Sequence, residues 1–123
     1  MAELLRAGKR ILLPFGEDHR YDLVIDEDGK FLRVQCKTGR LRNGAILFNT
    51  SSVHWHRGRP AKNYKGQADF FGVYCPALHA VYLVPVEDAA VTGASLRVQP
   101  TKSGQRQGVK LAAAYRLNPA AIV

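Results

Sequence analysis

The sequence predicts a mixed α/β domain, which follows from three observations. Residues 1–7 are typical of the end of a helix and are followed by Gly8, a residue common just after helix ends. Two neighbouring segments, 21–27 and 30–38, alternate apolar and polar side chains as strands do. A chain of 123 residues has the usual length of one domain, so we expect a single domain over residues 1–123.

Turn residues and apolar runs predict the remaining elements. The expected strands lie at 11–15, 45–49, 70–75, 80–86 and 95–98. A polar loop is expected at 16–20, a longer basic loop at 50–66 and a helical turn at 87–90. Residues 109–117 fit a final helix or a final strand. Both cysteines, Cys36 and Cys75, lie in apolar stretches, where we expect buried free thiols and therefore a reducing, cytoplasmic setting.

The charge of the chain favours a polyanionic partner. Eighteen Lys and Arg residues against ten acids give a formal net charge of +8. No acid lies between Asp28 and Asp69, and a second acid-free basic stretch follows Asp88. From the first stretch we expect six residues to contact DNA: Arg40, Arg42, Arg57, Arg59, Lys62 and Lys65.

Acidic residues are concentrated in one short segment, where six of the ten occur: Glu17, Asp18, Asp22, Asp26, Glu27 and Asp28. Carboxylates do not bind phosphate directly. They either solvate turns and strand ends or hold a divalent metal that contacts the phosphate, and Asp22 suits the second role.

The dipeptide Asp28-Gly29 predicts a two-residue hairpin turn between the strand-like segments. Counting outward from this turn, Asp22 lies opposite Gln35 in a non-hydrogen-bonded pair, with Cα atoms about 4.5 Å apart. Alternation places Lys37 on the same face. The other face is then the core, made of Leu23, Ile25, Leu32, Val34 and Cys36.

These groups can perform metal-assisted hydrolysis of a phosphodiester. The Asp22 carboxylate, the Gln35 amide oxygen and the backbone carbonyl of Cys36 are hard oxygen ligands suited to Mg²⁺. Lys37 can orient the attacking water or offset charge on the transition state. An ordinary exposed polar face of a hairpin remains the alternative, because antiparallel sheets often have polar residues on one side.

Tyr21-Asp22 followed by Gln35-Cys36-Lys37 resembles the signature of the PD-(D/E)xK nuclease superfamily. The segments PFGEDHRYDLVID, LRVQCKTGR, YKGQADFFGVY and YLVPV are similar to the group I intron-associated (homing) branch, to which archaeal-type Holliday junction resolvases are related. The resemblance implies a restriction-endonuclease-like domain with a central mixed β-sheet flanked by helices. It also implies Mg²⁺-dependent DNA cleavage, with Mn²⁺ as a substitute, by a homodimer or homotetramer.

The chain departs from the superfamily pattern at three points. Tyr21 replaces the signature proline, and Gln35 replaces the acid, which should weaken metal binding. The helical Glu that supplies a further ligand in the family would be expected before Glu3, and Glu17 is the substitute that we expect to act in its place. Homing and junction resolution both stay open, as does a non-catalytic basic module that binds DNA or RNA.

Overall fold

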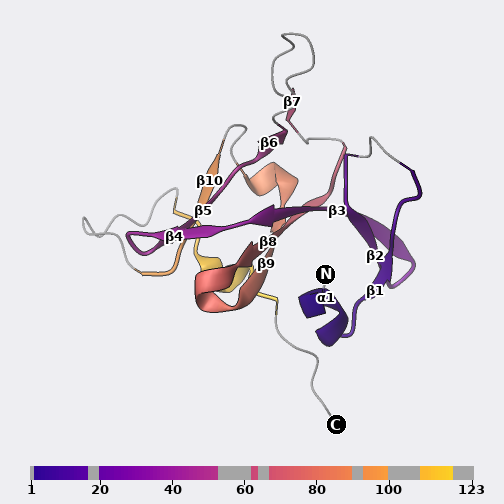
Figure 1. The fold of residues 1–123 in the computed structure, drawn as a ribbon, viewed down its shortest axis with the longest axis horizontal. Helices are drawn as coiled ribbons and strands as arrows, with labels where there is room; N and C mark the ends of the chain where they lie inside the picture. Colours follow the sequence, from indigo (N-terminus) through magenta and orange to yellow (C-terminus); the bar gives the residue numbers. More distant parts are fainter. Residues whose placement is uncertain are drawn as a thin grey trace.

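A five-stranded mixed sheet forms the centre of the protein, which we describe from a computed structural model (Figure 1). The structure describes residues 2–16, 20–52, 62–63, 67–89, 93–99 and 109–117. The strands are β1 (Arg10–Leu12), β2 (Leu23–Glu27), β3 (Lys30–Thr38), β8 (Phe70–Cys75) and β9 (Ala80–Pro85), in the order β1-β2-β3-β8-β9. β3 and β8 are parallel and the other neighbours are antiparallel, so the predicted mixed sheet is confirmed.

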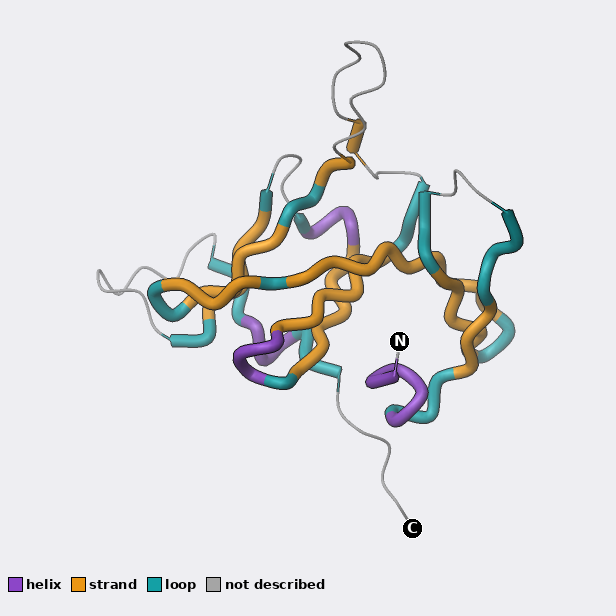
Figure 2. Tube along the Cα trace, viewed as in Figure 1, coloured by secondary structure: helices purple, strands orange, loops and turns teal. Residues whose placement is uncertain are grey.

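A second, smaller sheet has the order β10-β5-β4 and is antiparallel throughout. Its strands are β4 (Arg40–Arg42), β5 (Ala45–Phe48) and β10 (Ala94–Arg97). Two short strands, β6 (Ser51–Ser52) and β7 (Lys62–Asn63), pair within the expected 50–66 loop. The helical elements are α1 (Ala2–Arg6) and three 3₁₀ turns, η1 (Pro76–Leu78), η2 (Val86–Asp88) and η3 (Ala112–Ala114) (Figure 2).

The hairpin between β2 and β3 forms as predicted. Asp28 and Gly29 both have positive φ, at 52° and 77°, which is the backbone of a type I′ turn. Glu27 pairs with Lys30 and the ladder continues to Leu23 opposite Val34. The local turn signal therefore determined the register of the strand that carries the candidate site.

Each face of the central sheet is covered by a different element. Leu4 of α1 packs with Leu23, Ile25 and Val34 on one face. On the other face, Phe71, Val73, Tyr82 and Val84 of the central sheet pack with Ile46, Phe48 and Leu96 of the small sheet. The resemblance implied flanking helices, but in the described part of the chain only α1 is an α-helix and a sheet covers the opposite face.

Gly39 is the residue at which the chain passes from one sheet to the other. It directly joins β3 to β4, and Figure 1 shows the two strands as one long ribbon. A Cβ atom at Gly39 would lie 2.5 Å from Ile46 Cγ2 and 2.9 Å from Val73 Cγ1. Only glycine allows the two sheets to approach this closely.

Replacing Gly39 with Ala should therefore destabilise the protein by about 1–3 kcal/mol through overpacking. Gly93→Ala is the matched control, because a Cβ atom there has nothing within 4 Å. Chemical denaturation of both variants measures the difference. Equal stability of the two variants would contradict the close packing of the sheets at Gly39.

Two further expectations differ from the structure. Cys36 was expected in the core but is exposed, because it lies beyond the last β2–β3 pair, Leu23 with Val34, whereas Cys75 is buried as predicted. Residues 109–117 form neither a helix nor a strand of ordinary length. They contain η3, and Leu111 and Arg116 each make a single bridge.

No helix in the described ranges is long and apolar enough to span a membrane.

Candidate active site

The candidate site lies where β2 begins and β3 continues past it. Asp22 immediately precedes β2, and its backbone N–H donates to the carbonyl of Val34 at 2.9 Å. The ladder ends at Leu23 and Val34, so the expected Asp22–Gln35 pair is not part of it. Alternate backbone groups of β3 point toward β2, and Cys36 is the next in that series after Val34.

Beyond the end of the β2–β3 ladder, the Asp22 carboxylate accepts the hydrogen bond that a further residue of β2 would otherwise accept. Its Oδ2 accepts a hydrogen bond from the backbone N–H of Cys36 at 2.8 Å. An extended backbone needs a partner for each N–H, and here a side chain supplies it. The N–H and C=O of one strand residue point the same way, so the Cys36 carbonyl lies on the same edge as this carboxylate.

Gln35 reaches the same edge from the adjacent position. Its Nε2 donates to the Cys36 carbonyl oxygen at 3.5 Å, and the residue is half-buried. A half-turn of the amide group would present its oxygen instead of its nitrogen. Three oxygen donors can therefore gather here, from the Asp22 side chain, the Gln35 side chain and the Cys36 backbone.

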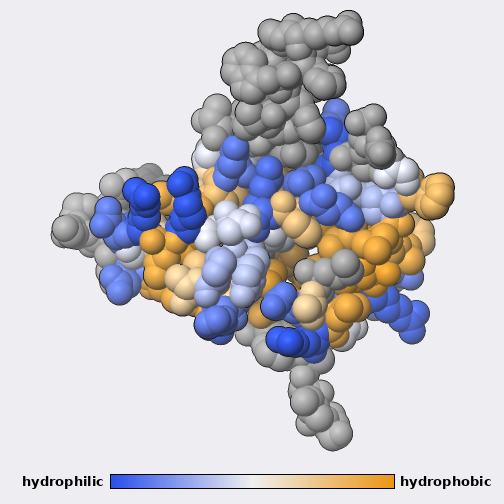
Figure 3. Space-filling view, in the orientation of Figure 1, coloured by the Kyte–Doolittle hydropathy of each residue, from blue (hydrophilic) through white to orange (hydrophobic). Residues whose placement is uncertain are grey.

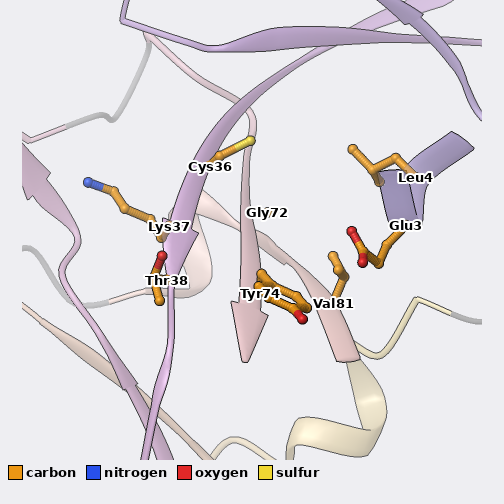
Figure 4. Close-up of a pocket in the computed structure, with 8 residues that line it drawn as sticks. All are labelled: Glu3, Leu4, Cys36, Lys37, Thr38, Gly72, Tyr74 and Val81. Atoms are coloured by element: carbon orange, nitrogen blue, oxygen red, sulfur yellow. The ribbon is translucent and has the colours of Figure 1, made fainter. Parts of the chain in front are cut away.

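Lys37 is half-buried on the opposite side of β3 from the Cys36 thiol, as Figure 4 shows. The pKa of Lys37 is lowered from its ordinary value, mainly because burial removes water from the ammonium group. The Asp22 carboxylate opposes this effect, and the Arg20 guanidinium adds to it. Lys37 thus lies within electrostatic range of the carboxylate that we expect to bind metal.

Arg20 is a residue of this region that sequence reasoning missed. It lies two positions before Asp22, and its Nε donates to Gln67 Oε1 in the segment that leads to β8. The guanidinium also acts on the Lys37 pKa. Its nearness to Asp22 in the sequence was the available signal.

A pocket of about 210 Å³ opens on the α1 side of β3 (Figure 4). Glu3 and Leu4 of α1 form one wall, and Cys36, Gly72 and Tyr74 lie opposite them. Cys36 is open to solvent through this pocket, yet desolvation, followed by the Asp22 charge, raises the pKa of its thiol. The raised pKa disfavours the thiolate, so the backbone carbonyl of Cys36 is the group that we expect to act as a ligand.

The remaining predicted site residues are only partly described. Arg40 and Arg42 are exposed on β4. Lys62 falls in β7. Glu17, Arg57, Arg59 and Lys65 lie outside the described residues.

The donor set suits a hard cation that keeps several water ligands. Mg²⁺ is usually bound by one or two carboxylates together with water and substrate phosphate. One carboxylate, one amide oxygen and one backbone carbonyl meet that need at Asp22, Gln35 and Cys36. No group of three or more His, Cys, Asp and Glu side chains able to hold a metal occurs within the described ranges.

The arrangement defines a class of nuclease: a carboxylate at the start of one strand, with a polar residue and a lysine two positions apart on the next strand of a mixed sheet. A sequence profile of the PD-(D/E)XK endonuclease family matches residues 1–118. The chain belongs to this family, as its sequence motifs predicted. Nucleases of the family generally depend on a divalent metal.

A solved structure supports the same assignment. The bacterial homing endonuclease I-Ssp6803I is similar to this protein, with a TM-score of 0.68 and 27% sequence identity. The match covers 94% of this chain and 79% of that chain. No curated protein gives a significant match.

Proposed function

We propose that the protein is a Mg²⁺-dependent DNA endonuclease that hydrolyses phosphodiester bonds, with Mn²⁺ able to replace Mg²⁺. One observation carries the proposal: the Asp22 carboxylate is bonded to the Cys36 amide, next to Gln35 and within electrostatic range of Lys37. The family and its homing-endonuclease relative support the substrate class.

Each group has a distinct role in this proposal. Asp22, Gln35 and the carbonyl of Cys36 hold the metal, with Glu17 as a further catalytic candidate from the preceding loop. A bound Mg²⁺ would polarise the scissile phosphate and lower the pKa of a coordinated water. Lys37 would donate a hydrogen bond to that water or to a phosphate oxygen, and its charge would offset negative charge that develops in the transition state.

Titration of Mg²⁺ against a supercoiled plasmid, a linear duplex and a four-way junction tests the proposal and separates its versions. We expect cleavage that requires the metal and stops on chelation. Cutting of duplex DNA at a defined site would indicate a homing-type enzyme, and cutting confined to the junction would indicate a resolvase. Binding without cleavage at any Mg²⁺ concentration would contradict the proposal and favour the non-catalytic module.

We further propose one nuclease domain over residues 1–123, acting in the cytoplasm as a homodimer or homotetramer. Apolar side chains exposed on and after β1 support self-association. Leu12 is 48% exposed, Leu13 62% and Phe15 fully exposed. Figure 3 shows an apolar area at its right, over β1 and β2. Exposed apolar surfaces of this kind are common at subunit interfaces.

A further inference from the structure

The small sheet presents a face that the active site does not use. The β-strand register aligns Arg42, Ala45 and Arg97 in one row and Arg40, Leu47 and Ser95 in the next. The intervening row, Leu41, Ile46 and Leu96, points to the opposite face, where Ile46 and Leu96 are fully buried and Leu41 is 39% exposed. Side chains alternate across a sheet, so all three arginines share the outer face.

Arg97 lies against the turn between β4 and β5. Asn43 and Gly44 form that turn with φ values of 50° and 74°, a type I′ hairpin like the one at Asp28 and Gly29. Arg97 Nη2 is 3.4 Å from the position that a Cβ atom on Gly44 would occupy, and the Gln99 side chain is 3.0 Å from it. Arg42 and Asn43 belong to this hairpin, and Arg97 and Gln99 lie against its Gly44, so the four residues surround one hairpin tip.

Hydrogen bonds brace this tip. The Gly44 carbonyl accepts from the backbone N–H groups of Val98 at 2.8 Å and Gln99 at 3.1 Å. Arg97 Nε donates to the Gln99 carbonyl at 3.1 Å. The side chains are therefore carried on a rigid element, which lowers the entropy lost when they bind a partner.

We propose that the β4–β5 hairpin tip, with Arg42, Asn43, Arg97 and Gln99, reads base pairs in the major groove of DNA. The major groove is about 12 Å wide and accepts a two-stranded β-ribbon. Arginine pairs with guanine there, and asparagine and glutamine pair with adenine. Hydrophilic side chains gather over β4 at the left of Figure 3, as an interface with a polyanion requires.

The hairpin also lies at a workable distance from the cleavage chemistry. Arg42 follows Lys37 by five residues along one continuous ribbon, which corresponds to roughly 17 Å of extended chain. At about 3.4 Å of helix axis per base pair, the bases read would lie on the order of five steps from the cleaved phosphate. This inference rests on the proposed function for its substrate class, and it adds the element that selects the sequence.

Selection of bound sequences from a randomised duplex library tests base reading by the hairpin tip. Ca²⁺ replaces Mg²⁺ in this assay, so that binding is measured without cleavage. We expect the unmodified chain to enrich one motif. The double variant Arg42→Ala/Arg97→Ala should lose discrimination at neighbouring base pairs, by about 5- to 150-fold per paired base. Asn43→Gly, which keeps the positive-φ turn, should relax one further position. The double variant Arg6→Ala/Arg10→Ala, which removes two exposed arginines of α1 and β1, is the charge-matched control and should select the parent motif.

Two results would overturn the inference. One is a double variant that remains folded in thermal unfolding and enriches the parent motif with uniformly weaker binding, because the arginines would then contact only phosphate. The other is an unmodified chain without any sequence preference or DNA binding. Plasmid cleavage with Mg²⁺ reports on the proposed function separately. A protein that selects a motif but never cuts DNA would contradict the proposed endonuclease activity and would still support base reading by the β4–β5 hairpin tip.

Discussion

Asp22→Asn should reduce metal-dependent cleavage by at least about 100- to 1000-fold, a typical loss when a charge-stabilising group is removed. The asparagine oxygen can still accept the hydrogen bond from the Cys36 N–H, so the local backbone keeps its partner. Only the carboxylate charge that would hold the metal is lost. The Asp22→Asn variant should therefore lose cleavage in single-turnover assays and keep its affinity for DNA, measured in Ca²⁺.

Lys37→Met should give a similar loss of cleavage, because it removes the ammonium and keeps most of the half-buried stem. Lys30→Met, an exposed lysine at the turn end of the same strand, is the control and should cleave normally. If neither Asp22→Asn nor Lys37→Met alters the cleavage rate, these residues do not form the active site.

Removing four basic residues of the 50–66 segment should have the largest effect on affinity. Each neutralised phosphate adds about 0.9 to the slope of log affinity against log salt. If Arg57, Arg59, Lys62 and Lys65 each contact one phosphate, changing all four to Ala should flatten the slope by roughly 3 to 4 units. Binding to every sequence should weaken alike, unlike the motif-specific loss expected at the hairpin tip.

Fluorescence anisotropy at several salt concentrations measures this slope. A variant with Arg6, Arg10 and Lys30 changed to Ala removes exposed charges far from the 50–66 segment in sequence and should keep the parent slope. A folded quadruple variant that also keeps the parent slope would contradict phosphate contacts in the 50–66 segment. It would indicate instead that phosphate is contacted by the basic C-terminal stretch from Arg97 to Arg116.

The sequence alone determined the β2–β3 hairpin and the side of β3 that carries Gln35 and Lys37, because both depend on contacts between near neighbours. Asp28 and Gly29 accept positive φ, which closes the turn and sets the pairing from Glu27 with Lys30 onward. Alternation along the strand then separates Val34 from Gln35 and Lys37. A similar local signal, Asn43-Gly44, closes the β4–β5 hairpin, although no strand was predicted at Arg40–Arg42.

Only the tertiary structure decided what surrounds Cys36 at the end of the β2–β3 ladder. Alternation placed Cys36 on the same face as Val34, which α1 covers, yet it could not show that this cover is incomplete and leaves the thiol exposed. Nor could it show that Asp22 turns its carboxylate to the Cys36 N–H, because that bond replaces a strand pair that ends one residue earlier.

The close packing at Gly39 and the placement of Arg42 and Arg97 on either side of Ala45 are likewise non-local. Gly39 must lack a side chain because Ile46 and Val73 approach it from two different sheets. Arg97 joins Arg42 across Ala45 although 55 positions separate them in the chain. Local propensity and periodicity report on backbone preferences within a few residues, whereas contacts like these exist only after the two sheets have packed against each other.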